Sequence, residues 1–386
     1  MERAIPSARD KLLFTPGPLT TSLSVKQAML HDAGSWHFEF TEVVTGIRNR
    51  LLALAGVSQE QGYEAVLMQG SGTFGVEAAI TSSVPRDGKL LVVANGAYGE
   101  RIARICEAAS IATEIVRYPE DTPASAADVD AALAADGSIT HAIAVHCETT
   151  TGILNPIDEI GRAVKARGRT YIVDAMSSFA AMRIHVAGSG IDYLISSANK
   201  CIEGVPGFSF VLARRDALLA SEGLAGEGLA REGHARSFSL DLLGQWRGFE
   251  KNGQFRFTPP THALLAFAQA LDELEREGGV EGRGARYRAN HTALMEGMGA
   301  LGFRPYLRPD VQSYIITSFH EPEHPAFDFR TFYRGLSERG MIIYPGKLTE
   351  VPTFRIGTIG RLFPADIRQL LVAIEDTMRE MGCLDG

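Results

Sequence analysis

Two short apolar runs end in residues that could do chemistry together. Residues 191–197 form one run, which leads through Ala198 and Asn199 to Lys200. A lysine enclosed at the end of a strand can lose its proton near neutral pH, and the neutral amine can bind an aldehyde covalently. A single lysine is far more often an ordinary surface residue. A catalytic role for Lys200 therefore needs support from the residues at the ends of neighbouring strands.

The preceding apolar run ends in a carboxylate. Residues 170–173 are followed by Asp174. An isolated acid at such a place is commonly a turn or helix-capping residue. Pyridoxal 5′-phosphate, however, needs both a lysine for its aldehyde and a carboxylate beside its pyridine nitrogen. The pair Asp174 and Lys200 therefore predicts a site for this cofactor.

A glycine-rich turn could bind the phosphate of that cofactor. The strand predicted at 65–68 leads through Gly70 into Ser71, Gly72 and Thr73, and a helical stretch follows. Free backbone N–H groups at a helix N-terminus bind anions well. Ser71, Gly72 and Thr73 are therefore the expected phosphate contacts.

The same turn also fits a dinucleotide-binding pattern. Gly70, Gly72 and Gly75 have the GxGxxG spacing of Rossmann domains, which is a weak signal on its own. A Rossmann domain usually has an acid after the next strand, but the strand predicted at 90–94 is followed by asparagine and glycine. We therefore favour the phosphate of another cofactor and keep a dinucleotide-binding protein, catalytic or not, as the alternative.

Two further residues follow predicted strands. Tyr98 comes shortly after 90–94, where its ring could stack on a planar cofactor, although a tyrosine that packs on the core at a helix start is equally common. The strand predicted at 142–146 ends in a threonine cluster. Thr149 is the best placed to offer its hydroxyl to a phenolate oxygen of the cofactor, and Thr151 is a neighbouring candidate.

One arginine lies inside an apolar run near the end of the chain. Arg355 is flanked by Phe354 and Ile356. A buried arginine needs an anionic partner, and its planar fork fits a carboxylate. Arg355 is therefore a candidate to bind a substrate carboxylate, and a structural ion pair is the alternative.

Composition narrows the class of protein. The chain has 386 residues, is 45% hydrophobic and carries a formal net charge of −8. The acidic balance argues against a nucleic-acid surface, and no apolar run is long enough to span a bilayer. The four cysteines lack CxxC spacing and the histidines lack paired ligand spacing. We expect a cytoplasmic protein with reduced thiols, no metal site, and no nucleic-acid or membrane partner.

Strands and helices alternate along most of the chain, with polar residues at the C-terminal ends of strands. This order predicts an α/β fold whose open, mostly parallel sheet is flanked by helices and carries the site along one edge. We expect an N-terminal arm at 1–24, a large cofactor-binding domain at 25–265 and a smaller C-terminal α/β domain at 266–386. Finer predictions are a helix at 287–301, strands at 313–316 and 341–344, and a mobile glycine-rich segment at 223–233.

The order of these motifs resembles the pyridoxal-phosphate fold type I aminotransferases of the alanine–glyoxylate branch, over nearly the whole chain. The resemblance rests on Ser71-Gly72-Thr73, Tyr98-Gly99-Glu100-Arg101, Glu148-Thr149-Thr150-Thr151-Gly152, Val173-Asp174, Asn199-Lys200 and Phe354-Arg355-Ile356-Gly357. Within that branch, the stretches at 14–20, 146–152, 196–200 and 344–349 are most similar to the enzymes that act on 2-aminoethylphosphonate and pyruvate.

The resemblance implies a cytosolic homodimer with shared active sites. Its implied catalytic residues are Lys200, which carries the cofactor, and Asp174, which contacts the pyridine nitrogen. Its implied binding residues are Tyr98 for stacking, Thr149 for the phenolate oxygen, Gly72, Thr73, Asn199 and the partner subunit's Thr258 for the phosphate, and Arg355 for the carboxylate of the keto acid. Arg256 and Lys347 are further candidates for the phosphonate, on their charge alone.

One departure leaves the amine substrate open. After Trp36, where the family is expected to have aspartates, this chain has His37-Phe38-Glu39-Phe40. Another aminotransferase of the branch, using alanine or serine with glyoxylate or pyruvate, is therefore an alternative. A cysteine desulfurase relative would need a mobile nucleophilic cysteine, for which Cys383 near the end is the poorly placed candidate.

Overall fold

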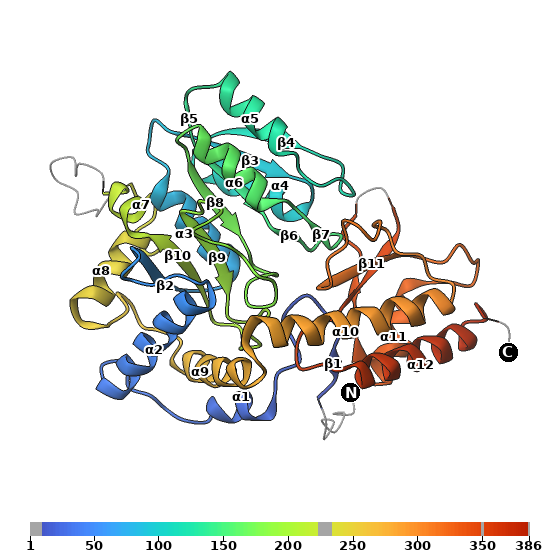
Figure 1. Cartoon of the computed structure of the whole chain (residues 1–386). Helices are drawn as coiled ribbons and strands as arrows, with labels where there is room; N and C mark the ends of the chain where they lie inside the picture. Colours follow the sequence, from blue (N-terminus) through green and yellow to red (C-terminus); the bar gives the residue numbers. More distant parts are fainter. Residues whose placement is uncertain (1–9, 223–233, 349–350, 385–386) are drawn as a thin grey trace.

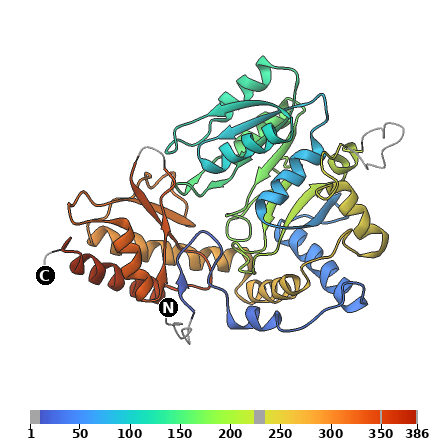
Figure 2. The ribbon, with the colours of Figure 1, turned by 180° about the vertical axis from the view of Figure 1, so that it is seen from behind.

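The computed structural model describes residues 10–222, 234–348 and 351–384. The segment predicted at 223–233 and residues 1–9 of the predicted arm lie outside these ranges. Figures 1 and 2 show a large α/β body, coloured blue to yellow, beside a smaller orange and red body built from the C-terminal part of the chain.

A seven-stranded sheet forms the centre of the large body, and its strand order is β2-β10-β9-β8-β5-β3-β4. The only antiparallel member is β10, which runs against both of its neighbours, so the prediction of a mostly parallel sheet is confirmed. The strands are β2 (Tyr63–Gln69), β3 (Lys89–Ala94), β4 (Ala112–Arg117), β5 (Ile139–Val145), β8 (Thr170–Asp174), β9 (Tyr193–Ser197) and β10 (Phe208–Arg214).

Helices cover both faces of this sheet (Figures 1 and 2). The central strands are almost entirely buried, as continuous apolar runs between two helical layers must be. Helices α3 (Gly72–Ser83) and α4 (Ala97–Ala108) lie on one face, and α5 (Ala126–Ala135) and α6 (Ile157–Ala166) lie on the other. The remaining helices of this body are α1 (Leu23–Ala28), α2 (Phe38–Leu54), α7 (Arg215–Ala220), α8 (Leu242–Asn252) and α9 (Thr261–Arg276).

The smaller body has its own sheet and its own apolar core. Its antiparallel sheet has the order β11-β14-β13, and Phe319, Phe332 and Phe354 are fully buried in the core beside it. The elements are α10 (Gly279–Ala300), β11 (Ile316–His320), α11 (Phe329–Glu338), β12 (Met341–Ile342), β13 (Tyr344–Pro345), β14 (Thr353–Gly357) and α12 (Pro364–Glu380). None of the helices in the described ranges is long and apolar enough to cross a membrane.

Three sequence predictions in this body need correction. The helix predicted at 287–301 belongs to α10, which begins at Gly279 because ion pairs of Arg283 and Arg286 with Glu277 offset its poorly helix-forming glycines. The strand predicted at 313–316 is β11, which covers 316–320. The strand predicted at 341–344 is two short strands, because β12 pairs with the N-terminal arm and β13 pairs with β14.

The N-terminal arm connects the two bodies. Its short strand β1 (Leu12–Leu13) pairs in parallel with β12 of the small body, and the next residues run past Lys200. The three-part division of the chain remains a proposal. Because Leu271 and Leu274 of α9 still pack in the large core, we would place the second boundary within α10 rather than at 265.

Candidate active site

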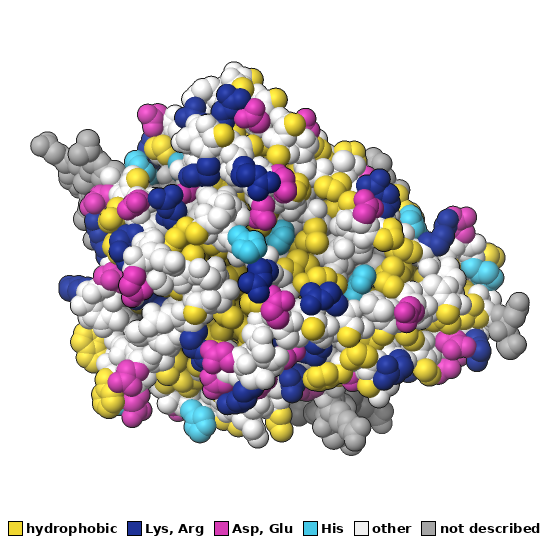
Figure 3. Space-filling model, in the orientation of Figure 1, with side chains coloured by type: hydrophobic (Ala, Val, Ile, Leu, Met, Phe, Trp, Pro, Cys, Tyr) yellow, Lys and Arg dark blue, Asp and Glu magenta, His cyan; other side chains and the backbone are white. Residues whose placement is uncertain are grey.

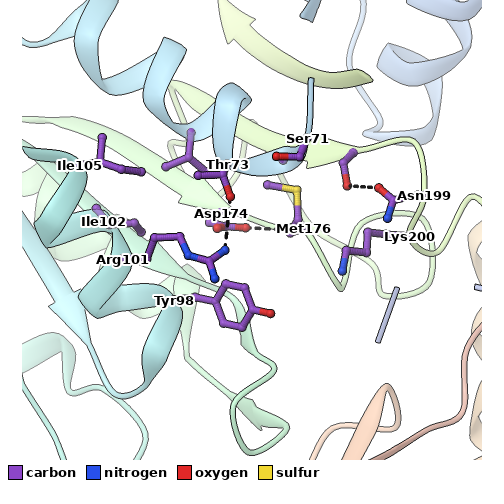
Figure 4. Close-up of a pocket in the computed structure, with 13 residues that line it drawn as sticks. Ser71, Thr73, Tyr98, Arg101, Ile102, Ile105, Asp174, Met176, Asn199 and Lys200 are labelled. Atoms are coloured by element: carbon purple, nitrogen blue, oxygen red, sulfur yellow. Dashed lines mark hydrogen bonds between the residues drawn. The ribbon is translucent and has the colours of Figure 1, made fainter. Parts of the chain in front are cut away.

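A cavity of about 250 Å³ lies where β8, the residues after β9 and the starts of α3 and α4 converge (Figure 4). The C-terminal ends of parallel strands meet at this edge, which is where ligands bind in open α/β sheets. The structure brings most of the predicted site residues into its wall. The lining residues are Ser71, Gly72, Thr73, Val76, Tyr98, Arg101, Ile102, Ile105, Asp174, Met176, Ser197, Asn199 and Lys200.

Lys200 is half-buried at this cavity, and the N-terminal arm holds its side chain. Its Nζ donates a hydrogen bond of 2.7 Å to the carbonyl oxygen of Pro16. Burial lowers the pKa of the Lys200 ammonium group, and the nearby charge of Lys347 acts in the same direction. The site therefore favours the neutral amine that covalent chemistry with an aldehyde requires.

Asp174 ends β8 and is 5% exposed. Its Oδ1 accepts a hydrogen bond of 2.9 Å from the backbone N–H of Met176, and within the described ranges its Oδ2 accepts none. Burial raises the pKa of Asp174 to about 6, and the negative charge of Glu148 adds to this rise. A buried carboxyl group in this state is suited to a cationic partner such as a protonated pyridine nitrogen.

Tyr98 lies in the first turn of α4, and Glu148 fixes this turn. The Glu148 Oε2 accepts from the backbone N–H groups of Tyr98 at 3.1 Å and Gly99 at 3.2 Å. Burial alone would raise the pKa of Tyr98, but Lys200, a hydrogen bond with Thr149 and the charge of Lys347 together lower it. The Tyr98 hydroxyl group thus lies close to the cationic side chains of Lys200 and Lys347.

Glu148, which the sequence patterns did not single out, positions Tyr98 by binding the backbone of its turn. The signal lay in the glycines before and after Tyr98, because a Cβ at Gly96 would overlap the Glu148 side chain and a Cβ at Gly99 would overlap Ala94 of β3. Glycine at 96 lets the backbone approach the buried acid, and glycine at 99 lets α4 pack closely on β3.

The turn before α3 offers several unused polar groups to an anion. The backbone N–H groups of Gly72 and Thr73 and the Ser71 hydroxyl have no hydrogen-bond acceptor or donor among the described residues. Asn199 lines the same cavity, and the Arg101 guanidinium donates to the Thr73 hydroxyl at 3.3 Å. These groups fit a phosphate at the positive end of the α3 dipole.

Glycine packing also explains the GxGxxG spacing. A Cβ at Gly72 would overlap the Met176 sulfur, and a Cβ at Gly75 would lie 2.7 Å from the Ser209 hydroxyl oxygen. These two glycines therefore let α3 pack closely on the residues after β8 and on β10. The spacing has a structural cause here that does not require a dinucleotide.

Arg355 reaches this region from β14 of the small body. It is 2% exposed, and its Nη1 donates to the backbone oxygen of Thr149 at 2.8 Å while its Nε donates to that of Pro345 at 3.0 Å. Thr149 is buried and contacts the Tyr98 hydroxyl. Within the described ranges no carboxylate forms an ion pair with Arg355, so the structural ion pair that was the alternative is not found there.

Other predicted residues lie outside the cavity. Thr258 is exposed and does not line the cavity, and its backbone oxygen accepts a hydrogen bond of 3.3 Å from the Gln69 side chain. Arg256 forms an ion pair of 3.2 Å with Asp241. His37 caps the exposed start of α2, away from the cavity wall. Cys383 is at the far end of the small body, and burial raises the pKa of its thiol, which disfavours a nucleophilic thiolate.

Residues 23–358 match the Aminotransferase class-V family model, so the chain belongs to the class-V aminotransferases, which use pyridoxal phosphate. It is 51% identical over 372 residues to the 2-aminoethylphosphonate–pyruvate transaminase of Syntrophobacter fumaroxidans, covering 96% of this chain and 97% of that protein. It is 50% identical over 371 residues to the protein of the same name from Vibrio vulnificus strain CMCP6, covering 96% and 98%.

Solved structures agree on the fold. The alanine–glyoxylate aminotransferase from Nostoc sp. superposes with a TM-score of 0.86 at 22% identity over 98% of each chain. The pyridoxamine–pyruvate aminotransferase from Mesorhizobium loti gives a TM-score of 0.85 at 23% identity, over 98% of this chain and 94% of that chain. The fold is therefore that of the fold type I pyridoxal-phosphate aminotransferases, and the Rossmann alternative is overturned.

Proposed function

We propose that this chain transfers the amino group of 2-aminoethylphosphonate to pyruvate and so produces phosphonoacetaldehyde and L-alanine. The observation that carries the chemistry is the single cavity that encloses Lys200 and Asp174 beside the unused N–H groups of α3. The substrate pair is supported by relatives of that named activity at about half identity over nearly the full chain.

Lys200 and Asp174 divide the catalytic work. Bound pyridoxal phosphate supplies an aldehyde that takes up amino groups and a ring that withdraws electrons from the carbon that loses a proton. The Lys200 amine would hold the aldehyde, and once the substrate amine has taken its place it would be positioned to take up the proton from the amino-bearing carbon of the substrate. Asp174 would keep the pyridine nitrogen of the bound cofactor protonated, since its buried carboxylate needs a cation.

The remaining residues orient the two molecules. We assign Ser71, Gly72, Thr73 and Asn199 to the phosphate, and Thr258 of the partner subunit joins them. Tyr98 stacks on the ring, and Thr149 binds its phenolate oxygen. Arg355 binds the carboxylate of pyruvate, because its guanidinium is buried without an acidic partner in the described ranges.

We propose a cytoplasmic homodimer with shared sites. A surface hollow that includes Thr258 is lined by polar and charged side chains and by two exposed aromatic residues, Trp36 at 79% and Phe257 at 39% exposure. Such apolar area is costly in water and is suited to a second copy of this chain. The described cysteines form no disulfide, as is usual for a protein kept in a reducing compartment.

Product analysis tests this assignment. The purified enzyme with pyridoxal phosphate, 2-aminoethylphosphonate and pyruvate should yield phosphonoacetaldehyde and L-alanine in equal amounts, detected by phosphorus NMR and amino-acid analysis. L-Serine and L-alanine as donors, each with glyoxylate, provide the comparison. The assignment is wrong if 2-aminoethylphosphonate is not consumed while one of those donors is.

A further inference from the structure

A second cation of the small body lies beside Arg355. The Lys347 Nζ is 3.3 Å from the Tyr98 hydroxyl oxygen and 4.6 Å from the centre of its ring. Tyr98 also lies close to two other cations: its side chain hydrogen-bonds Arg355, and the charge of Lys200 acts on its hydroxyl group. The two small-body cations therefore converge on Tyr98, which lines the cavity.

Neither Lys347 nor Arg355 forms an ion pair with an acidic side chain within residues 10–222, 234–348 and 351–384. Lys347 is half-buried, and in the described part of the chain its side chain makes a single hydrogen bond, to Tyr98. Within the described ranges, Arg355 donates to the backbone oxygens of Thr149 and Pro345 and hydrogen-bonds the Tyr98 side chain, and none of these acceptors is a carboxylate. Two converging cations that form no ion pair with a described carboxylate are suited to bind an anion, because enclosed charges require a compensating partner.

The two substrates of the proposed reaction differ in charge and shape. A phosphonate is tetrahedral and carries up to two negative charges near neutral pH, as a phosphate group does, whereas a carboxylate is planar and carries one. The fork of Arg355 can satisfy a carboxylate by itself. A phosphonate leaves an oxygen and a charge for which a second cation is needed.

We propose that Lys347 is the residue that selects the phosphonate: its Nζ binds one phosphonate oxygen while Arg355 binds the others. This inference rests on the proposed function. Two other cations already have partners. Arg101 donates to Thr73 and lies near Asp174 in the cavity (Figure 4), and Arg256 lies outside the cavity, where it pairs with Asp241. In the pyruvate half-reaction, Arg355 acts without Lys347.

Three variants of the holoenzyme test this role. Lys347→Met removes the charge, Lys347→Arg keeps it, and Lys11→Met is a matched control whose exposed ammonium contacts Ser337 of α11. Single-turnover absorbance gives the specificity constants for 2-aminoethylphosphonate and L-alanine. Calorimetry gives the dissociation constants of ethylphosphonate and propionate, which lack the amine and cannot react.

Lys347→Met should lower the specificity constant for 2-aminoethylphosphonate about 10- to 100-fold, as the loss of one hydrogen bond between charged groups does. The loss for L-alanine should be at least about tenfold smaller. Ethylphosphonate binding should weaken in parallel, and Lys347→Arg should recover most of both losses. Lys11→Met should behave as the wild type does.

Two results would overturn the role of Lys347 and leave the proposed function standing. One is an equal loss for both amines in Lys347→Met. The other is an undiminished reaction with 2-aminoethylphosphonate. If the wild-type enzyme itself does not react with 2-aminoethylphosphonate but reacts with L-alanine, both proposals are wrong.

Discussion

Burial acts in opposite directions on the two charged residues at the strand ends. It lowers the pKa of the Lys200 ammonium group and raises that of the Asp174 carboxyl group, so each moves towards its neutral form. The neutral amine is ready to bind an aldehyde. The carboxyl group, in contrast, can hold its charge fully only when a cation lies opposite, and a protonated pyridine nitrogen provides one.

Asp174→Asn should therefore stabilise the cofactor-free protein relative to the wild type as the pH rises. Folding raises the pKa of Asp174 from 3.8 to about 6. Ionisation of Asp174 therefore does not lower the free energy of unfolding below about pH 4, and it lowers it by roughly 3 kcal/mol above about pH 6. Thermal unfolding of both cofactor-free proteins between pH 4 and 7 measures this difference. A difference in melting temperature that does not change with pH would contradict the buried, unpaired carboxyl group.

Lys200→Ala should abolish covalent attachment of the cofactor and lower turnover by at least about 10³-fold. Borohydride reduction of the holoenzyme followed by peptide mass analysis should find the cofactor on Lys200 of the wild type and on no lysine of the variant. Lys26→Ala, which removes a surface ammonium paired with Asp10, is the control and should be labelled on Lys200. Labelling at another lysine in the wild type would refute the assignment.

At the scale of elements, a loop of the arm completes the wall around Lys200. Gly17 has a φ of +121°, and a Cβ there would lie 2.8 Å from the Lys200 Nζ. Glycine is required at position 17 for two reasons: its φ is in a region that other residues rarely adopt, and a side chain there would clash with Lys200. Because the arm also pairs with β12, it fixes the small body relative to Lys200.

Gly17→Ala should lower activity at least about tenfold, because the new methyl group displaces Lys200 in addition to the backbone strain of roughly 1 kcal/mol or more. Gly56→Ala is a matched control, since its φ is +69° but a Cβ there meets nothing within 4 Å. Activity at saturating cofactor and the melting temperature of both variants separate the two effects. Equal changes in the two variants would show that contact with Lys200 is unimportant.

The sequence predicts those parts of the site that follow strands locally. Asp174, Lys200 and Thr73 are each read from a short apolar run and the polar residue after it, and the sheet brings these strand ends together. The contacts of Lys200 with Pro16 and of Arg355 with Thr149 join residues far apart in the chain. No periodicity or spacing encodes such pairs, because they depend on how the two bodies pack.

At the scale of the whole molecule, charged side chains of both signs are interspersed on the face shown in Figure 3. The hollow at Trp36 and Thr258 combines exposed aromatic residues with a predicted cofactor contact. The site of one subunit would thus be completed by its partner. The short-range pattern of the sequence cannot reveal this, since the cavity of one chain does not include Thr258.

Mixed dimers test whether Thr258 acts across the interface. A dimer of one Lys200→Ala subunit and one Thr258→Ala subunit should contain one intact site if Thr258 serves the partner's cofactor. Its active site should then bind pyridoxal phosphate as tightly as the wild type does, whereas the Thr258→Ala homodimer should bind it about tenfold more weakly. Weak binding in the mixed dimer would place Thr258 in the site of its own subunit.

The near-ultraviolet and visible spectrum of the holoenzyme tests the central claim most directly. The yellow band of the lysine-bound cofactor should disappear when 2-aminoethylphosphonate is added without a keto acid, and pyruvate should restore it. A band that responds only to alanine or serine would contradict the phosphonate assignment. A protein in which pyridoxal phosphate produces no band would contradict the catalytic role of Lys200.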